Sequence, residues 1–584
     1  MKLTGSLGYI CVRCGSSEAK ESQIQQQPIT LRNCFPFKLV RPSQEAVLEE
    51  IEEAVQSKKF IILEAPVGFG KSAVAAALCK YLGSAHILTA TKQLQDQYSS
   101  AFGYPTIKGK ANFQCYVGTT SGAILPCSKG RCVVDWDLND CPHYLSFEGY
   151  KQHKNKSCDR DSKCEHLKDK KQCTYYDQKW YGFMSSVAVY NYSFLLSELK
   201  YAKNVPKRKL LVCDEAHDLE RQIVGFASFQ LKKSTLQPYH DELRPGEEFE
   251  IAHRGQDDPA TWLDVLDSAK SLLSEYLEIH KEADEAQDKV AVCKNLLESL
   301  ESCMGSIKMQ SANWIVNNVK LDSNLSVEEV IFQPLNISSY TSPLFEIAEK
   351  VLMMSATIFS NERLYKSLGI PPGEAVIIRV QDSAFPVESR PIYALNTAYL
   401  SKATMNSSLE SIARAVDKIM DRHANEKGVI HTTSYAQARY IVQNVSELNR
   451  KRLITTEGSF DKSTLIRIHG ASDSSVLISP SLHEGVDLKD DLSRFQVIVK
   501  VPYPDLSERR TQTILQRDRA WYDLQTAQRL VQTYGRSVRS ETDHAVTYVL
   551  DSNFTRFVDS NRNLFPKYFL EAMKVGNLPE LKSL

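Results

Sequence analysis

The sequence lacks any long apolar run, and this absence is the first constraint on the class of protein. No stretch approaches the roughly 18–20 apolar residues that span a bilayer, so we expect no transmembrane helix and no membrane association. The first residues, Met1–Ser6, carry one charge and no sustained apolar segment, which is not typical of a signal peptide. We therefore expect a reducing compartment: the cytoplasm or nucleoid, or the nucleus if the source is eukaryotic.

The sequence also lacks net charge, internal repeats and low-complexity segments. Its 584 residues include 71 Lys and Arg and 71 Asp and Glu, so the formal net charge is zero. This balance argues against a polybasic nucleic-acid-binding tail, although it leaves room for a local basic groove in one domain. A length of 584 residues predicts several domains.

Short apolar runs alternate with longer helical patterns, which is typical of α/β proteins. One set of predicted strands comprises Phe60–Leu63, His86–Leu88, Leu210–Cys213 and Val351–Met354. A second set comprises Gly428–His431, Val476–Ile478, Val497–Lys500 and Val546–Val549. The sequence therefore predicts an α/β fold with two parallel-sheet domains.

Two regions interrupt this alternation. Residues 111–180 are rich in Cys, Lys and Asp, whereas residues 258–308 carry apolar side chains at the i, i+3, i+4 spacing of amphipathic helices. Strand patterns resume after each region, so both are predicted to be insertions into the first α/β domain. The second insertion is predicted to be a helical hairpin.

A glycine-rich segment, Ala65–Ser72, follows the first predicted strand and precedes a helical run. It nearly matches the pattern of a phosphate-binding loop, with Ala65 in place of the first glycine. Such glycines let backbone N–H groups turn inward around phosphates, and the helix start adds partial positive charge. We expect ATP and Mg²⁺ here, with the loop formed by Gly68 and Gly70, the β- and γ-phosphates contacted by Lys71, and Mg²⁺ bound by Ser72.

An acidic pair, Asp214 and Glu215, follows the predicted strand Leu210–Cys213. The carboxyl ends of such strands form the edge where α/β sheets bind ligands. We expect Asp214 to hold Mg²⁺ through water and Glu215 to orient and deprotonate the attacking water. His217 is expected to report the nucleotide state to neighbouring motifs.

Two arginines near the C-terminus, Arg536 and Arg539, are three residues apart. On one face of a helix they would project toward the same place. Planar guanidinium groups stabilise charge on a transferring phosphoryl group, and two lobes that close on each other would complete such a site.

These segments together resemble the superfamily 2 helicases, in which Asp214–His217 corresponds to the DEAH box. Other segments resemble further motifs of the family in the expected order, namely Arg41–Gln44, Thr89–Leu94, Ser355–Thr357, His483–Asp487 and Gln532–Arg539. The resemblance implies that Arg41, Gln44 and Asp487 contact the nucleotide. It also implies that Gln532 acts in catalysis beside Arg536 and Arg539.

The cysteine-rich region resembles the iron–sulfur domain of the XPD/DinG branch, which binds a [4Fe–4S] cluster through four thiolates. Seven cysteines are candidates: Cys115, Cys127, Cys132, Cys141, Cys158, Cys164 and Cys173. The DinG-type spacing favours Cys115, Cys158, Cys164 and Cys173. The XPD-type spacing favours Cys115, Cys127, Cys132 and Cys173, and a zinc site remains the structural alternative. The pair Cys11 and Cys14 is half of a zinc motif, and we expect a locally ordered or flexible segment there.

The resemblance covers about residues 38–560 and implies two RecA-like motor domains, an iron–sulfur insertion and an arch-like helical insertion. We expect an N-terminal segment at 1–37 and a C-terminal tail at 576–584. Motor domain 1 is expected to comprise 38–110, 183–240 and 341–385, and motor domain 2 to comprise 386–575. The iron–sulfur domain is expected at 111–182 and the arch at 241–340.

The cysteine-rich region also combines basic and aromatic residues, a pattern found in proteins that bind single strands. The lysines are Lys151, Lys154, Lys156, Lys168, Lys170 and Lys171, and the aromatic residues are Tyr175, Tyr176, Trp180 and Tyr181. The alternative is a solvated lysine face with aromatic residues in the core, and the family resemblance favours rings that stack on bases.

The resemblance implies an ATP-dependent DNA helicase that moves 5′→3′ on single-stranded DNA, unwinds forked duplexes and acts as a monomer. One alternative is an ATP-driven translocase or remodeller that does not unwind DNA. Another is a metal-stabilised DNA-binding redox sensor with a vestigial ATPase.

Overall fold

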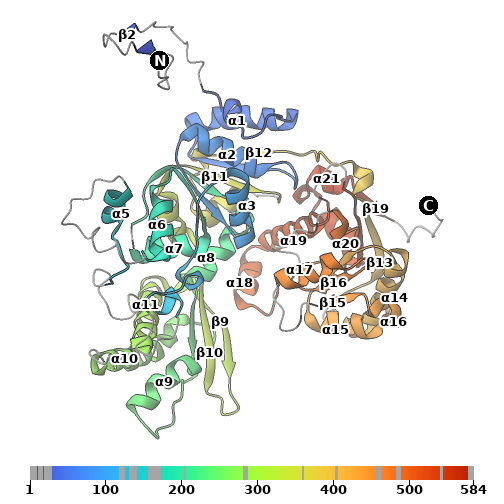
Figure 1. The fold of residues 1–584 in the computed structure, drawn as a ribbon. Helices are drawn as coiled ribbons and strands as arrows, with labels where there is room; N and C mark the ends of the chain where they lie inside the picture. Colours follow the sequence, from blue (N-terminus) through green and yellow to red (C-terminus); the bar gives the residue numbers. More distant parts are fainter. Residues whose placement is uncertain are drawn as a thin grey trace.

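The structure, a computed structural model, describes residues 9–10, 17–18, 29–117, 125–130, 141–154, 172–202, 204–280, 287–357, 361–400, 405–455, 457, 462–481, 488, 490–538 and 543–575. Two α/β lobes lie side by side, and a third unit of helices and strands extends below the first lobe (Figure 1). We call the lobes motor domains 1 and 2, and the third unit the arch.

Motor domain 1 is built on a seven-stranded parallel sheet whose strand order is β12-β3-β11-β7-β4-β6-β5. The strands are β3 (Phe60–Glu64), β4 (Ala85–Thr89), β5 (Thr106–Ile107), β6 (Val187–Asn191), β7 (Arg208–Cys213), β11 (Ala348–Ser355) and β12 (Ala375–Arg379). Its helices are α1 (Pro42–Ser57), α2 (Lys71–Leu82), α3 (Lys92–Phe102), α5 (Phe147–Lys154), α6 (Thr174–Met184), α7 (Tyr192–Ser197), α8 (Leu219–Ala227), α12 (Ser338–Phe345) and α13 (Asn361–Leu368). The central strands are apolar on both faces because helices cover both sides, as in other parallel sheets.

Motor domain 2 has its own seven-stranded parallel sheet, in the order β15-β16-β14-β17-β18-β13-β19. The strands are β13 (Ile392–Ala398), β14 (Gly428–His431), β15 (Leu453–Thr455), β16 (Val476–Ser479), β17 (Phe495–Ile498), β18 (Val546–Asp551) and β19 (Met573–Val575). The helices are α14 (Met405–Arg422), α15 (Tyr435–Asn444), α16 (Glu447–Arg450), α17 (Lys462–Ala471), α18 (Arg509–Arg517), α19 (Arg519–Tyr534), α20 (Asn553–Ser560) and α21 (Lys567–Leu570). The two parallel sheets confirm the predicted fold class. The strand predicted at Val497–Lys500 lies two residues earlier, because the ladder with its neighbours ends at Ile498.

The arch is more than the predicted helical hairpin. Its helices α10 (Leu263–Ile279) and α11 (Gln287–Gln310) pair as expected, and α9 (Lys233–Leu243) packs beside them. A three-stranded antiparallel sheet completes the unit, in the order β8 (Phe229–Lys232), β10 (Val327–Pro334) and β9 (Trp314–Leu321). The sequence analysis did not predict these strands, because charged residues interrupt their runs of apolar residues.

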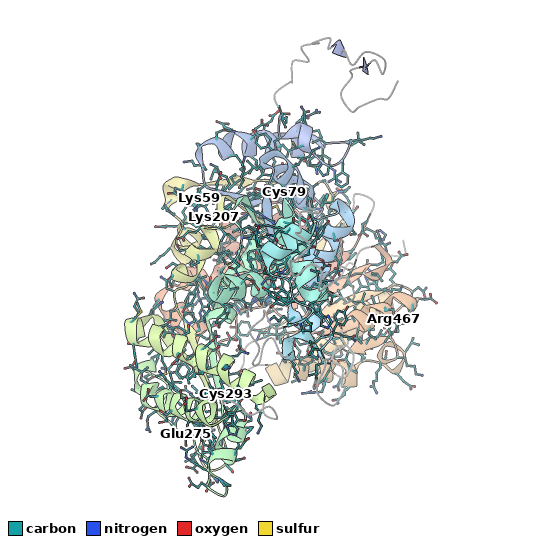
Figure 2. The ribbon with its side chains drawn as sticks, turned by 60° about the vertical axis from the view of Figure 1, so that its left-hand side comes forward. Lys59, Cys79, Lys207, Glu275, Cys293 and Arg467 are labelled. Carbon is teal, nitrogen blue, oxygen red and sulfur yellow. The ribbon has the colours of Figure 1, made fainter. Side chains whose placement is uncertain are left out.

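The arch has its own apolar core and begins at β8, before the expected boundary at residue 241. Trp262 and Tyr276 are fully buried in that core. Cys293 and Glu275 mark the arch in Figure 2, well apart from Cys79 in motor domain 1. Among the helices that the structure describes, none is sufficiently long and apolar to cross a membrane.

Helices α18 and α19 join motor domain 2 to the other two units. Arg510 donates to Glu220 on α8 at 2.8 Å and to the carbonyl of Pro334 in the arch at 3.0 Å. Arg363 of motor domain 1 pairs with Asp518, the residue that caps α19. These contacts set the position of the lobes and, through α19, of the segment that follows it.

Candidate nucleotide site and cysteine cluster

The segment Ala65–Ser72 forms a strand–loop–helix unit between β3 and α2, as predicted. Gly68 and Gly70 have φ values of +77° and +94°, a region that side chains other than glycine rarely adopt. A Cβ at Gly68 would lie 2.1 Å from the ring of Phe385, and one at Gly70 would lie 2.7 Å from Gln44. Both positions therefore need glycine for conformation and for space.

Lys71 is the first residue of α2, and its ammonium group lies over the loop. Nζ donates to the carbonyl oxygens of Ala65 at 3.0 Å and Pro66 at 3.3 Å. A positive charge and the N–H groups of a helix start thus lie at the same point, the combination that binds phosphate.

Arg41 and Gln44 hold the loop from outside. Arg41 donates to the carbonyl of Gly68 at 2.9 Å, and Gln44 donates to that of Phe69 at 2.6 Å. The Gln44 side chain also accepts from the Arg41 backbone N–H at 3.0 Å. The structure therefore brings these two predicted nucleotide-binding residues to the loop, where they fix its carbonyl groups.

The acidic pair follows β7, two strands away from β3, because β11 lies between them in the sheet. Asp214 is buried, and its carboxylate accepts from the Tyr98 hydroxyl at 2.9 Å and from the Glu215 N–H at 3.0 Å. Burial, followed by the charge of Glu215, raises the pKa of Asp214 to about 6. Glu215 itself has a φ of +51°, a strained value for a non-glycine residue and one that often marks a functional site.

Glu215 is surrounded by positive charge. Burial opposes its ionisation, but a hydrogen bond from His217 and the charges of His217, Lys71 and Arg536 outweigh burial and hold its pKa below its usual range. Glu215 is therefore an ionised carboxylate that can accept a proton.

His217 links the segment Asp214–His217 to the end of β11. Its Nδ1 lies 3.0 Å from the Ser355 hydroxyl and 3.3 Å from Glu215. Ser355 in turn lies 2.8 Å from the Thr357 hydroxyl. Side-chain contacts thus connect His217 to Ser355 and Thr357, which belong to a neighbouring motif.

Arg536 reaches this site from motor domain 2, since it is one of the charges acting on Glu215. Gln532 lines a cavity of about 370 Å³ between the lobes together with His217. The prediction that the two arginines share a helix face is wrong for Arg536, because α19 ends at Tyr534 and Arg536 follows in a turn. Arg539 and Asp487 lie outside the described residues.

Two residues at this site were not predicted. Tyr98, on α3, is buried against Asp214, and Phe385, in the segment between the lobes, packs on Gly68 and against Val538. Neither residue belongs to a sequence motif, so neither composition nor spacing indicated that they lie at this site.

Four cysteines of the cysteine-rich region gather in the structure: Cys115, Cys127, Cys141 and Cys173. Backbone hydrogen bonds bring their segments together, from the N–H of Cys127 to Phe113 at 2.7 Å and from the N–H of Cys173 to His143 at 2.8 Å. The thiols of Cys127 and Cys173 share a hydrogen bond, and Cys141 is within electrostatic range of Cys173 and Cys115.

The pKa of the Cys173 thiol is lowered, whereas burial raises that of Cys141. The hydrogen bond of Cys173 with Cys127 and the N–H groups of Tyr175 and Tyr176, at the start of α6, outweigh burial and lower its pKa to about 6. A thiolate is the form that binds metals. Within the described ranges, no three His, Cys, Asp or Glu side chains form a site for a single metal ion. Cys132, Cys158 and Cys164 lie outside the described residues, as do Cys11 and Cys14.

The prediction that the aromatic residues of this region stack on bases is wrong for three of the four. Tyr175, Tyr176 and Trp180 are 3%, 5% and 3% exposed, and they belong to the core of motor domain 1. Tyr181 is 56% exposed. The helix α6 that carries them packs its apolar face inward, and this packing explains the aromatic spacing. Lys151 pairs with Glu148 at 3.4 Å; the other lysines of the set lie outside the described side chains.

Family models match two segments of the chain. Residues 107–236 match the DEAD_2 family, and residues 418–572 match the helicase C-terminal domain family. A search of curated proteins found no match.

The fold is similar to solved structures over nearly the whole chain. A structure named XPD_Helicase is 16% identical with a TM-score of 0.63, and the match covers 93% of this chain and 100% of the other. XPD_APO is 14% identical with a TM-score of 0.58, covering 91% and 100%. S. tokodaii Xpd4 is 15% identical with a TM-score of 0.56, covering 92% and 100%.

Each lobe carries one family match, DEAD_2 in the first and the helicase C-terminal domain in the second. These two matches and the fold together support a superfamily 2 helicase of the XPD/DinG type. Its activity is that of an ATP-dependent helicase.

Proposed function

We propose that the chain is a DNA helicase that moves 5′→3′ on single-stranded DNA as a monomer and unwinds forked duplexes. The observation that most supports its ATP-hydrolysis cycle is that the charge of Arg536, from motor domain 2, contributes to lowering the pKa of Glu215 in motor domain 1. Polarity, DNA preference and oligomeric state rest on the family resemblance.

In this proposal ATP lies between the loop of motor domain 1 and the arginines of motor domain 2. Gly68, Gly70 and Lys71 bind its phosphates, and Arg41 and Gln44 brace the loop. Ser72 and Asp214 hold Mg²⁺, which neutralises charge on the phosphates. Asp487 completes the nucleotide site.

Hydrolysis needs a base and a group that stabilises transition-state charge. Glu215, kept ionised by its positive neighbours, accepts a proton from the attacking water. Arg536 and Arg539, with Gln532, stabilise charge on the transferring phosphoryl group. Because these groups come from the second lobe, product release loosens the contact between the lobes, and this cycle drives movement along DNA.

The experiment that tests the proposal compares unwinding and ATP turnover. We expect turnover to rise with added single-stranded DNA, and a forked duplex with a 5′ tail to be unwound at least about tenfold faster than one with only a 3′ tail. DNA-stimulated turnover without unwinding of either substrate would instead support a translocase. Equal stimulation by RNA would contradict the DNA preference.

The gathered cysteines support a [4Fe–4S] cluster. Four thiols suit such a cluster, and one of them, Cys173, is already acidic. We propose Cys115, Cys127, Cys141 and Cys173 as the ligands. This set keeps Cys115 and Cys173 of the DinG-type set and takes Cys127 and Cys141 in place of Cys158 and Cys164, which lie outside the described residues. When bound, the cluster would link three chain segments and so stabilise the cysteine-rich region.

The ligand set has a direct test in iron content. We expect Cys127→Ser and Cys141→Ser to lose most of the iron and the visible absorbance of protein purified anaerobically. We expect Cys158→Ser and Cys164→Ser to keep both. Cys293→Ser, a buried thiol in the arch, is the matched control. Iron loss in the Cys158 and Cys164 variants alone would restore the DinG-type set, and one bound zinc without iron would replace the cluster.

A further inference from the structure

A buried tyrosine contacts one of the two residues proposed to hold Mg²⁺. Tyr98, on α3, is fully buried, and its hydroxyl donates to Oδ2 of Asp214 at 2.9 Å. The hydroxyl therefore holds one oxygen of this carboxylate in place.

The same tyrosine fixes the carboxylate of Asp214. Tyr98 donates to Oδ2, while the backbone N–H of Glu215 donates to Oδ1 at 3.0 Å. Donors on both oxygens prevent rotation of the carboxylate group, and each oxygen keeps lone-pair capacity for a metal-bound water.

We propose that Tyr98 is a positioning residue of the magnesium site, which orients the carboxylate of Asp214 through its hydroxyl. This inference rests on the proposed role of Asp214. Groups that orient metal ligands in this way typically contribute 10–100-fold in metal affinity. The ring packs among apolar residues of motor domain 1, a role that phenylalanine fills equally well. The hydroxyl is thus separable from the packing.

Tyr98→Phe removes only the hydroxyl, and Tyr192→Phe is its matched control. Tyr192 is also buried, and its hydroxyl donates at 3.1 Å to the backbone carbonyl of Asp214, away from the carboxylate. Both variants lose one buried hydrogen bond at the same residue. They differ in whether that bond orients a metal ligand.

The first measurement is DNA-stimulated ATP turnover against free Mg²⁺ at saturating ATP. In Tyr98→Phe we expect the half-saturating Mg²⁺ concentration to rise about tenfold or more, with turnover at saturating Mg²⁺ reduced no more than about threefold. In Tyr192→Phe we expect no change beyond about twofold. A drop in maximal turnover without a Mg²⁺ shift, or an equal shift in both variants, would overturn the proposal.

The second measurement needs no turnover. Binding of Mn²⁺ to the ADP-bound protein, followed by electron paramagnetic resonance, should weaken about tenfold in Tyr98→Phe and stay unchanged in Tyr192→Phe. Unchanged binding in Tyr98→Phe would overturn the proposal. Full turnover in Lys71→Ala would contradict the proposed nucleotide site. An inactive Lys71→Ala together with a normal Tyr98→Phe would contradict only the proposed role of Tyr98.

Discussion

Replacement of Arg536 by alanine is expected to reduce ATP turnover about 10³-fold, while ATP binding falls far less. An arginine supplied by the second lobe stabilises charge that develops only in the transition state, so its loss lowers kcat more than it raises KM. A 10³-fold loss corresponds to about 4 kcal/mol. Steady-state turnover with and without single-stranded DNA measures the effect.

Two further variants sharpen this test. Arg536→Lys keeps the charge but loses the planar pair of donors, so we expect it to recover only part of the rate. Arg519→Ala removes an exposed arginine from α19 and should leave turnover within about twofold. Normal turnover in Arg536→Ala would show that the second lobe does not complete the site.

Replacement of Lys71 by alanine is expected to reduce both ATP turnover and unwinding by at least about 10²-fold. The ammonium group is the positive charge that the loop contributes to the phosphates, and such preorganised charges contribute most where water is excluded. Single-strand binding in the absence of ATP should persist, because Lys71 lies in the loop and contacts its carbonyl groups. Turnover, unwinding and strand binding are measured on the same preparation.

Lys80→Ala is the control for this second prediction. Lys80 is an exposed lysine in the last turn of the same helix, α2, so its loss removes a charge without changing the loop. If DNA-dependent function survived in Lys71→Ala at its normal level, the ATPase would be vestigial, and the redox-sensor alternative would gain support.

Much of the motor could be predicted because its signals are local. The loop Ala65–Ser72 and the DEAH box each sit in a few consecutive residues beside a strand, and seven of the eight predicted strands coincide with or lie within observed ones. Apolar runs of four residues suffice to identify strands buried on both faces. The arch sheet was not predicted because β9 and β10 are only partly buried on one face and carry polar or charged residues there.

The cysteine-rich region shows the limit of such patterns. Seven cysteines with similar spacings permit several sets of four, and the aromatic residues of α6 have the same sequence whether they stack on bases or fill a core. Burial decided the second question, since Tyr175, Tyr176 and Trp180 lie inside. The first depends on how cysteines 12 to 58 residues apart in sequence fold back on one another, and spacing does not encode this.

The sequence by itself determined that this chain has two parallel-sheet lobes, a glycine-rich loop between a strand and a helix, an acidic pair and a cysteine-rich region. Only the tertiary structure decided that Tyr98 reaches Asp214, 116 residues away, and that the charge of Arg536 in one lobe acts on Glu215 in the other. The physical reason is that a strand or a loop is specified by its own residues. A contact across the sheet or between lobes depends on strand order and on the packing of every helix between.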